Sequence, residues 1–405
     1  MKVIVTGAEE HQGLAVIRGL GLRGVPVVAC GSRPRSLGFG SRFATETAVY
    51  RSPFRSPGDF VADLTAIMER TGAGMVMPAV ESTLAVLDEH RGRFERQCRL
   101  AAPPSEVLEL ALDKWRTVAL AERLGVPVPR TVCAEGLDGV LREADALIYP
   151  LALKPRGGAL YRGTRHDLPF KVRYAASRTE LVRILESIQP GSTYPLVQEL
   201  IPGTGVCVAA VCDQGEALAL FPYARLREMP LSGGVSVLRE SIPLEPRLGE
   251  YATRLLREMR WHGVAMVEFK YDPAADRYTL MEVNGRFQAS TALSLDAGVN
   301  LPYLVYCLYS GTPLPEQPGA YVTGVRERWL RGDMLALLDH LLGNRVWPRP
   351  PDAAPRLPSR LEALWDFVKG FRPGMRYDEF KVDDWGPWLV GVWELVTALF
   401  EYGRW

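Results

Sequence analysis

The chain has 405 residues, 47% of them hydrophobic and 23% charged, and a formal net charge of +1 at pH 7. This length allows roughly two to four domains, and the near-neutral charge gives no electrostatic reason to expect nucleic acid or acidic lipid as a partner. The six cysteines are scattered without a CxxC pair, which favours free thiols over disulfides or a cysteine metal site. No apolar run reaches the ~20 residues that span a bilayer, and the chain opens directly on a strand (MKVIVTG), so we expect no signal peptide, no membrane span and a cytoplasmic location.

The first hundred residues alternate between predicted strands and helices. Short apolar runs at 3–5, 25–30 and 75–78 predict strands, and amphipathic segments at 12–23 and 60–71 predict helices. Strands separated by helices are typical of a parallel sheet. This part of the chain is therefore expected to form a parallel α/β domain.

A glycine turn follows the first predicted strand. The turn sequence TGAEEHQG lacks the GxGxxG spacing of dinucleotide-binding folds, and its two acidic residues would face a pyrophosphate. An NAD-linked enzyme is therefore not expected. His11 in this turn and Glu81 in the turn PAVEST both follow predicted strands, where α/β proteins gather ligands. Both are substrate-binding candidates, with ordinary turn residues as the alternative.

The next region brings an amphipathic helix (DKWRTVALAERLG), a strand at 148–155 and a glycine-bearing loop at 156–165. Only seven of the 48 basic residues are lysine, so each interior lysine is informative. Lys154 lies in an apolar strand just before the loop, where an ammonium beside backbone N–H groups freed by glycine can hold a phosphate. Lys114 stands in the first turn of the helix, where a cation opposes the helix dipole, and a nearby anion would explain it. For both, a solvated lysine remains the alternative.

Two strands, ending in VEFKYD and LMEVN, are predicted to form a hairpin. Counting across its loop pairs Tyr278 with Asp272 and Glu282 with Glu268. Like charges that face each other destabilise a ladder. Two carboxylates in register within apolar strands therefore predict a cation between them.

Glu282, Asn284 and Arg286 are two residues apart and are expected to share one face of their strand, with Met281 and Val283 on the other. Two carboxylates and an amide form an all-oxygen ligand set that suits Mg²⁺ or Mn²⁺. The sequence predicts a metal site here, with a solvated sheet face as the alternative.

From about residue 319 the chain predicts a helix at 334–342, a proline-rich linker (WPRPPDAAPRLP) and a Trp-rich apolar helix at 388–400. The last helix lacks the basic face of a membrane-surface helix. We expect it to pack on the body of the protein or across a homodimer.

The motifs DKW, LALKPRGG, VQELIPGTG, VEF and MEVNGR, in this order and at these separations, resemble those of the ATP-grasp superfamily over residues 100–315. The N-terminal unit resembles the preATP-grasp domain of carbamoyl-phosphate-synthase-like and biotin-carboxylase-like ligases. The resemblance implies a mixed α/β and α+β chain of four parts: a parallel α/β preATP-grasp domain at 1–100, a lobe with the glycine loop at 101–192, a lobe with antiparallel strands and the metal site at 193–318, and a helical extension at 319–405. Gly285 stands where the family more often has proline.

The resemblance also implies roles for the matched residues. ATP phosphates would be held by Lys114, Lys154 and the loop glycines Gly157, Gly158 and Gly163, and adenine by the segment Gln198, Glu199 and Leu200. Two Mg²⁺ ions would be held by Glu268, Glu282 and Asn284. Arg286 would be catalytic, stabilising the phosphoryl group during transfer.

The activity implied by the resemblance is that of a carboxylate–amine ligase. ATP would activate a carboxylic acid as an acyl phosphate, an amine would capture it, and ADP and phosphate would be released. The loop LSGGVSVLRES borders the metal hairpin, which makes Ser236 and Arg239 substrate-binding candidates, with Arg225 a weaker one; surface arginine is the alternative. A small-molecule kinase and a non-catalytic nucleotide-binding protein remain open, and the sequence does not identify the acid or the amine.

Overall fold

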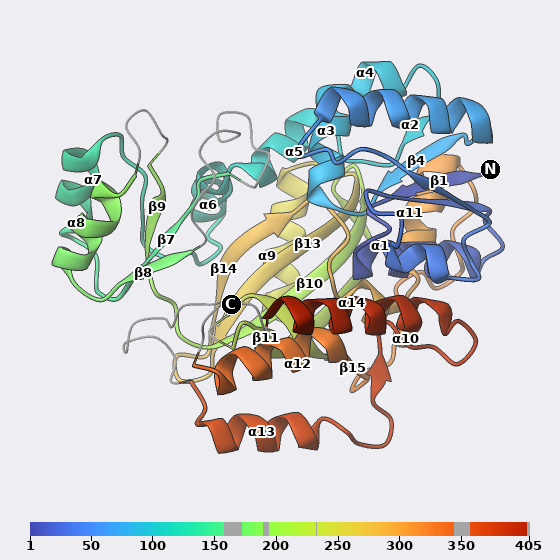
Figure 1. The fold of residues 1–405 in the computed structure, drawn as a ribbon. Helices are drawn as coiled ribbons and strands as arrows, with labels where there is room; N and C mark the ends of the chain where they lie inside the picture. Colours follow the sequence, from blue (N-terminus) through green and yellow to red (C-terminus); the bar gives the residue numbers. More distant parts are fainter. Residues whose placement is uncertain (158–171, 189–193, 232, 344–356, 403–405) are drawn as a thin grey trace.

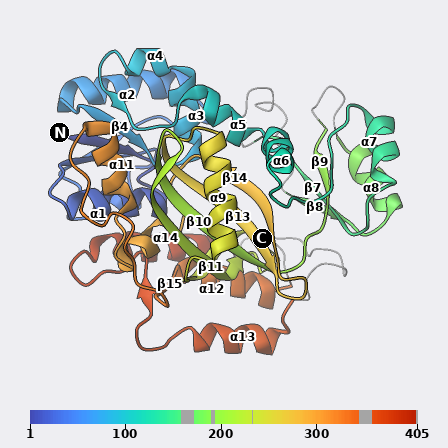
Figure 2. The ribbon, with the colours of Figure 1, turned by 180° about the vertical axis from the view of Figure 1, so that it is seen from behind.

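The computed structural model describes residues 1–157, 172–188, 194–231, 233–343 and 357–402, with side chains up to residue 397. Figures 1 and 2 show three parts: an N-terminal domain in blue, a small green unit that projects from the side, and a central sheet with orange and red helices along one edge. The predicted combination of a parallel sheet with antiparallel sheets and helices is confirmed.

The N-terminal domain is a parallel sheet in the order β3-β2-β1-β4-β5. Its strands are β1 (Val3–Thr6), β2 (Val27–Gly31), β3 (Glu46–Val49), β4 (Met75–Pro78) and β5 (Arg99–Leu100). Its helices are α1 (His11–Gly21), α2 (Pro57–Thr71), α3 (Glu81–Glu89) and α4 (Arg91–Phe94), with a 3₁₀ turn η1 at Leu37–Gly40. The central strands are buried along their whole length, as expected of a parallel sheet covered on both faces.

The strand order of this sheet reverses between β1 and β4, which lie side by side. Ligands of open α/β sheets bind beyond the carboxyl ends of the strands at such a reversal. Helix α1 begins there at His11 and helix α3 at Glu81. Gly7 and Gly13 make the first turn tight, since a Cβ on Gly13 would lie 2.0 Å from the carbonyl oxygen of Gly7.

The small unit is an antiparallel sheet in the order β6-β9-β7-β8, covered by two helices. Its elements are β6 (Thr131–Val132), α7 (Leu137–Ala144), β7 (Leu151–Lys154), β8 (Arg173–Ala175), α8 (Arg178–Glu186) and β9 (Leu196–Glu199). It has its own core, which includes Val140, Leu153 and Leu181. Helices α5 (Ser105–Leu112) and α6 (Lys114–Arg123) lead into it from the N-terminal domain.

Among the described residues, the large sheet has the order β14-β13-β10-β11-β12-β15-β16. Its strands are β10 (Thr204–Asp213), β11 (Glu216–Met229), β12 (Val235–Ser241), β13 (Gly263–Asp272), β14 (Arg277–Asn284), β15 (Arg326–Arg328) and β16 (Arg376–Tyr377). Helix α9 (Pro246–Glu258) covers one face. The other face shares a core with α1, α10 (Thr291–Asp296) and α11 (Leu301–Ser310), so the N-terminal domain and this sheet pack as one body.

The C-terminal region was predicted to be a helical extension, but it also adds β15 and β16 to the edge of the large sheet. Its helices are α12 (Leu330–Leu341), α13 (Arg360–Lys369) and α14 (Gly386–Tyr402), and α14 packs against η1 of the N-terminal domain. The buried guanidinium of Arg18 in α1 binds Asp384 just before α14, with Nε 2.7 Å from Oδ2. In the part of the chain that the structure describes, no helix combines the length and apolar character that a membrane crossing requires.

Candidate active site

A cleft of about 710 Å³ lies between the small unit, the large sheet and the N-terminal domain, and we call it the main cleft. Most residues predicted for the site line it: His11, Lys114, Lys154, Gly157, Gln198, Glu199, Leu200, Arg225, Ser236, Glu268, Glu282 and Arg286. Asn284 and Glu81 line a smaller hollow, which shares Lys114 and Arg286 with the main cleft. Gly158 and Gly163 lie outside the described residues, and Arg239 does not line the cleft.

Glu268 and Glu282 face each other across β13 and β14, as predicted. Nearer the hairpin loop the predicted alignment is wrong by one residue, because Tyr278 pairs with Tyr271 and not with Asp272. A bulge between the two halves of the ladder corrects the register before the glutamates are reached. The facing pair therefore depends on an irregularity that simple counting does not include.

Met281 is the extra residue of this bulge. It lines the main cleft beside Glu282, so the prediction that it lies on the opposite face is wrong. Val283 does pack in the core beneath α9, as expected. A bulge re-aims a side chain in this way because two residues of one strand oppose a single residue of the other.

The two glutamates have different electrostatic surroundings. Lys114 Nζ lies 3.4 Å from Glu282 Oε2, and the Asn284 amide donates to Glu282 Oε1 at 2.9 Å. Burial disfavours the charged form of Glu282, but Lys114 and the Asn284 hydrogen bond outweigh it and lower its pKa to about 2. Burial raises the pKa of Glu268, against the opposing charge of Arg225, which is bonded to it.

The predicted metal ligands suit a hard divalent cation. Two carboxylates in register would repel each other unless a positive charge lies between or beside them, and carboxylate and amide oxygens are ligands that Mg²⁺ prefers. In the described residues, Glu268, Glu282 and Asn284 provide such a set, although no group of three or more His, Cys, Asp or Glu side chains is arranged to hold a metal. The donor chemistry therefore fits Mg²⁺ completed by water or phosphate oxygens.

Lys114 is the first residue of α6, directly after the N-cap Asp113. The Asp113 carboxylate accepts the backbone N–H of Trp115 at 3.0 Å and binds Arg156 at 2.8 Å, while the Lys114 N–H donates to the Arg156 carbonyl at 2.9 Å. Gly157 forms a β-bridge with Asp113. The start of the glycine loop is thus attached to the beginning of the helix that carries Lys114.

Lys154 is the last residue of β7 and lies within the fields of both glutamates. Burial lowers its pKa, and the charges of Glu282 and Glu268 offset only part of this effect. Within the described residues it makes no hydrogen bond or ion pair. Its ammonium is therefore available to an anion in the main cleft.

The predicted adenine segment forms the end of β9, at the junction of the two lobes. Gln198 is buried and donates to Thr131 Oγ1 at 3.0 Å, while its Oε1 has no partner among the described residues. The Glu199 carboxylate accepts the N–H of Ile148 at 2.9 Å. The N–H of Leu200 donates to the Pro150 carbonyl at 3.1 Å, so this backbone group is already occupied.

Arg286 follows β14 and points toward the N-terminal domain, where its Nε lies 3.9 Å from Glu81 Oε2. The preceding Gly285 allows a close approach, because a Cβ there would lie 2.8 Å from Leu108 Cδ1 and 3.1 Å from Trp261. This crowding leaves no room for a side chain at position 285 without a shift of its neighbours.

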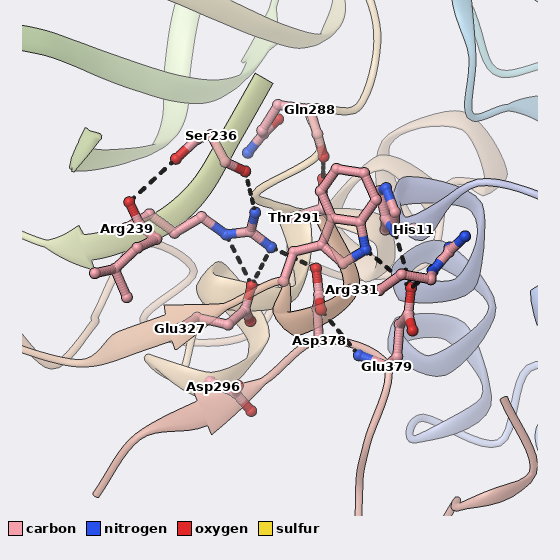
Figure 3. Close-up of polar contacts among 12 residues, drawn as sticks. His11, Ser236, Arg239, Gln288, Thr291, Asp296, Glu327, Arg331, Asp378 and Glu379 are labelled. Carbon is pink, nitrogen blue, oxygen red and sulfur yellow. Dashed lines mark hydrogen bonds and ion pairs between the residues drawn. The ribbon is translucent and has the colours of Figure 1, made fainter. Parts of the chain in front are cut away.

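Arg239 was predicted to bind substrate, but its side chain is fully buried and ion-paired within the protein. Its Nη2 lies 2.5 Å from Glu327 and 2.8 Å from Asp378, and its Nη1 donates to the Ser236 carbonyl at 2.8 Å. Figure 3 shows this network joining β12 to the C-terminal region. Its geometry gives Arg239 a structural role behind Ser236, and Arg225 is likewise held by Glu268 and Glu228.

Lys270 and Trp329 are among the residues lining the main cleft that sequence reasoning missed. Lys270 donates to the Ile201 carbonyl at 2.9 Å and so links β13 to the inter-lobe segment. The scarcity of lysine was a signal for it, because three of the seven lysines line this cleft. Trp329 comes from the C-terminal region, where no motif pointed to the site.

A model of the family described as "ATP-grasp in the biosynthetic pathway with Ter operon" matches residues 193–332. N5-carboxyaminoimidazole ribonucleotide synthase of Synechococcus elongatus is 29% identical over 207 residues, which cover 50% of this chain and 49% of that protein. The carbamoyl phosphate synthase large chain of Thermomicrobium roseum is 25% identical over 344 residues, which cover 80% of this chain and 30% of that protein. The chain thus spans half or less of the length of these relatives.

Solved structures share the fold at lower identity. Biotin carboxylase from Campylobacter jejuni, in complex with a form of ATP, matches with a TM-score of 0.65 at 17% identity and covers 80% of this chain and 74% of that one. N5-carboxyaminoimidazole synthetase from Staphylococcus aureus matches with a TM-score of 0.63 at 12% identity and covers 85% of this chain and 86% of that one.

The fold is that of biotin carboxylase and of N5-carboxyaminoimidazole synthetase. Residues 193–332 thus match an ATP-grasp family model, and the chain is homologous to carbamoyl phosphate synthase and to N5-carboxyaminoimidazole ribonucleotide synthase.

Proposed function

We propose that the protein is an ATP- and Mg²⁺-dependent ligase that activates a carboxylic acid as an acyl phosphate and joins it to an amine, releasing ADP and phosphate. The observation that carries the proposal is the facing pair Glu268 and Glu282, set in one cleft with Lys114 and Lys154. Phosphoryl transfer depends mainly on positioning and charge neutralisation, and this arrangement offers both. The relatives are named as synthases, which supports a bond-forming reaction.

Each residue has a proposed part in this reaction. Lys114, Lys154 and the glycine loop beginning at Gly157 hold phosphate oxygens, and the segment Gln198 to Leu200 holds adenine. Glu268, Glu282 and Asn284 hold Mg²⁺, which supplies charge neutralisation at the β- and γ-phosphates. Arg286, which follows β14 and lines the same cleft as the two glutamates, contacts the phosphoryl group as it leaves ATP.

The domain limits remain proposals at 1–100, 101–192, 193–318 and 319–405. The strand pairings support two adjustments. Strand β9 pairs within the small sheet and fits better with the second unit, and β15 and β16 extend the large sheet of the third.

A trapping experiment tests the proposal. Purified protein is incubated with ATP, Mg²⁺, pools of carboxylic acids and hydroxylamine, and both hydroxamate and ADP are measured. An acyl phosphate intermediate gives the two products in equal amounts, and ¹⁸O in the acid carboxylate appears in the released phosphate. Release of AMP and pyrophosphate would indicate an adenylate instead. A stable phosphorylated product without hydroxamate would favour a kinase, and no turnover with any acid would favour a binding protein.

A further inference from the structure

His11 and Glu379 form a buried pair at the end of the main cleft that the phosphoryl-transfer roles above leave unused. Figure 3 shows the two side chains pointing toward each other, one from the start of α1 and the other from the segment before α14. His11 Nδ1 lies 3.6 Å from Glu379 Oε1 and has no hydrogen bond within the described residues. His11 is only 6% exposed and still lines the cleft.

The surroundings fix both partners of this pair. The ring of His11 packs against Trp329, with ring centroids 4.0 Å apart. Glu379 Oε1 accepts the indole N–H of Trp329 at 3.0 Å and two N–H groups of Arg331 at 2.9 and 3.1 Å. Glu379 is therefore held close enough to His11 to form an ion pair with the imidazolium that forms when the ring takes up a proton.

His11 lines the same cleft as the residues proposed for phosphoryl transfer. It begins the helix after β1, and Glu81 begins the helix after the neighbouring strand β4. Glu81 in turn contacts Arg286. Gln288, two residues beyond Arg286, lines the cleft between them with both polar atoms of its buried amide unpartnered in the described residues. His11, Gln288 and Arg286 therefore line one and the same cleft.

The charge of this end of the cleft favours an amine over an acid. Three guanidinium groups packed around it are each held by two carboxylates: Arg225 by Glu228 and Glu268, Arg239 by Glu327 and Asp378, and Arg331 by Glu379 and Glu394. These three cations are neutralised and offer little to a carboxylate. Glu10, beside His11, adds negative charge.

We propose that His11 is the proton acceptor for the amine that attacks the acyl phosphate, and that Glu379 of the C-terminal region is its positioning residue. This inference rests on the proposed ligase function. One proton of the ammonium passes to the imidazole of His11, and the nitrogen lone pair then forms the C–N bond. The bond between the acyl carbon and the oxygen that bridges to phosphorus breaks, and phosphate leaves with the electron pair of that bond. The second proton of the nitrogen leaves with the phosphate.

The test compares two nucleophiles on the acid found by hydroxylamine trapping. Hydroxylamine is largely unprotonated at neutral pH and needs no proton acceptor to attack. Primary amines are protonated, so ammonium, methylamine and the common amino acids are offered as amine probes, and the one that gives most amide with wild type is used. His11→Gln is expected to lower amide formation by roughly 10²–10⁴-fold, the usual contribution of general-base catalysis, while hydroxamate formation continues.

The pH profile separates a proton acceptor from a purely structural histidine. Raising the pH supplies unprotonated amine, so amide formation by His11→Gln should recover toward the wild-type rate. The charged groups near His11 are Glu379, Arg331, Glu10 and Glu394, so Glu379→Gln should also change the acid side of the amide profile, with less effect on hydroxamate. The controls are His90→Gln and Glu316→Gln, which alter exposed side chains.

Several outcomes would overturn the inference. Equal loss of amide and hydroxamate in His11→Gln would make the residue structural, and an unchanged amide rate would give it no part in the reaction. If hydroxamate forms but none of the amines gives an amide, an amine is not the attacking substrate, although the acyl phosphate is still formed. Absence of hydroxamate with every acid would instead refute the ligase function itself.

Discussion

Glu268 and Glu282 face each other across β13 and β14 although the strands shift register by one residue beside them. Each carboxylate has its own cation, Arg225 for Glu268 and Lys114 for Glu282. Each of the two charges is thus compensated by a separate cation, and we propose that a metal ion lies between the carboxylates.

Glu282→Gln is expected to keep the fold and abolish turnover at any practical Mg²⁺ concentration, because the amide removes one of the two charged ligands. Wild type should gain thermal stability from Mg²⁺ with ATP, and the variant should gain little. Thermal melts with and without both ligands check this. If the melting temperature of the wild type did not change on addition of Mg²⁺ and ATP, the metal site would be contradicted.

Without metal, Glu282→Gln should destabilise the protein at pH 7, because it removes the charged partner of Lys114. The pKa of Glu282 is lowered in the folded state from its ordinary 4.5 to about 2. Its ionised form therefore contributes stability above pH 4.5, and this contribution is lost as the pH falls toward 2. Melting temperatures of wild type and variant should differ at pH 7 and converge on acidification. A variant that is more stable at pH 7 would mean that repulsion from Glu268 dominates.

Lys154→Ala should weaken ATP binding by about 1.5–3 kcal/mol, the contribution of a charge-assisted hydrogen bond. No internal partner of Lys154 within the described residues is left unpaired by the change, so the stability of the unliganded protein should hardly fall. Calorimetric titration with ATP and Mg²⁺ measures the affinity. Lys369→Ala, which alters a lysine outside the main cleft, is the matched control, and unchanged affinity in Lys154→Ala would refute the phosphate role.

Arg286→Lys keeps the positive charge but loses the planar guanidinium group with its paired N–H donors. If this group acts in the transition state, kcat should fall by roughly 10²–10³, as for a lost preorganised donor, while ATP affinity changes little. Steady-state kinetics on the trapped acid, combined with ATP titration, distinguishes the two effects. A change confined to ATP affinity would place Arg286 in ground-state binding.

Arg239→Met should destabilise the protein by about 3–5 kcal/mol, because it leaves Glu327 buried without its counter-ion. Adding Glu327→Met should recover part of the loss, since both charges are then absent. Urea denaturation measures both variants. Arg257→Met, at an exposed pair with Glu216, should change little. If Arg239→Met instead kept its normal stability but bound substrate more weakly, Arg239 would have the substrate-binding role that its burial argues against.

The sequence predicted the fold class and several of the charged residues that line the cleft because those signals are local. Lys154 before a glycine loop and Glu282 two residues from Asn284 are visible in short stretches. The bulge at Met281 was not visible in this way, because moving the loop by one residue gives a strand register that is equally plausible. Arg239 was misjudged because its partners, Glu327 and Asp378, lie 88 and 139 residues away, and only the folded chain brings them together.

The bond between Arg18 and Asp384 has a consequence for the order in which the chain is made. The two residues are 366 positions apart, and at the usual ~5–20 residues per second of synthesis the second follows the first by roughly 20–70 s. During that interval α1 carries a cation whose buried site lacks its counter-charge. The nascent N-terminal domain is therefore expected to expose this helix, and with it His11, to chaperones until residue 384 has left the ribosome.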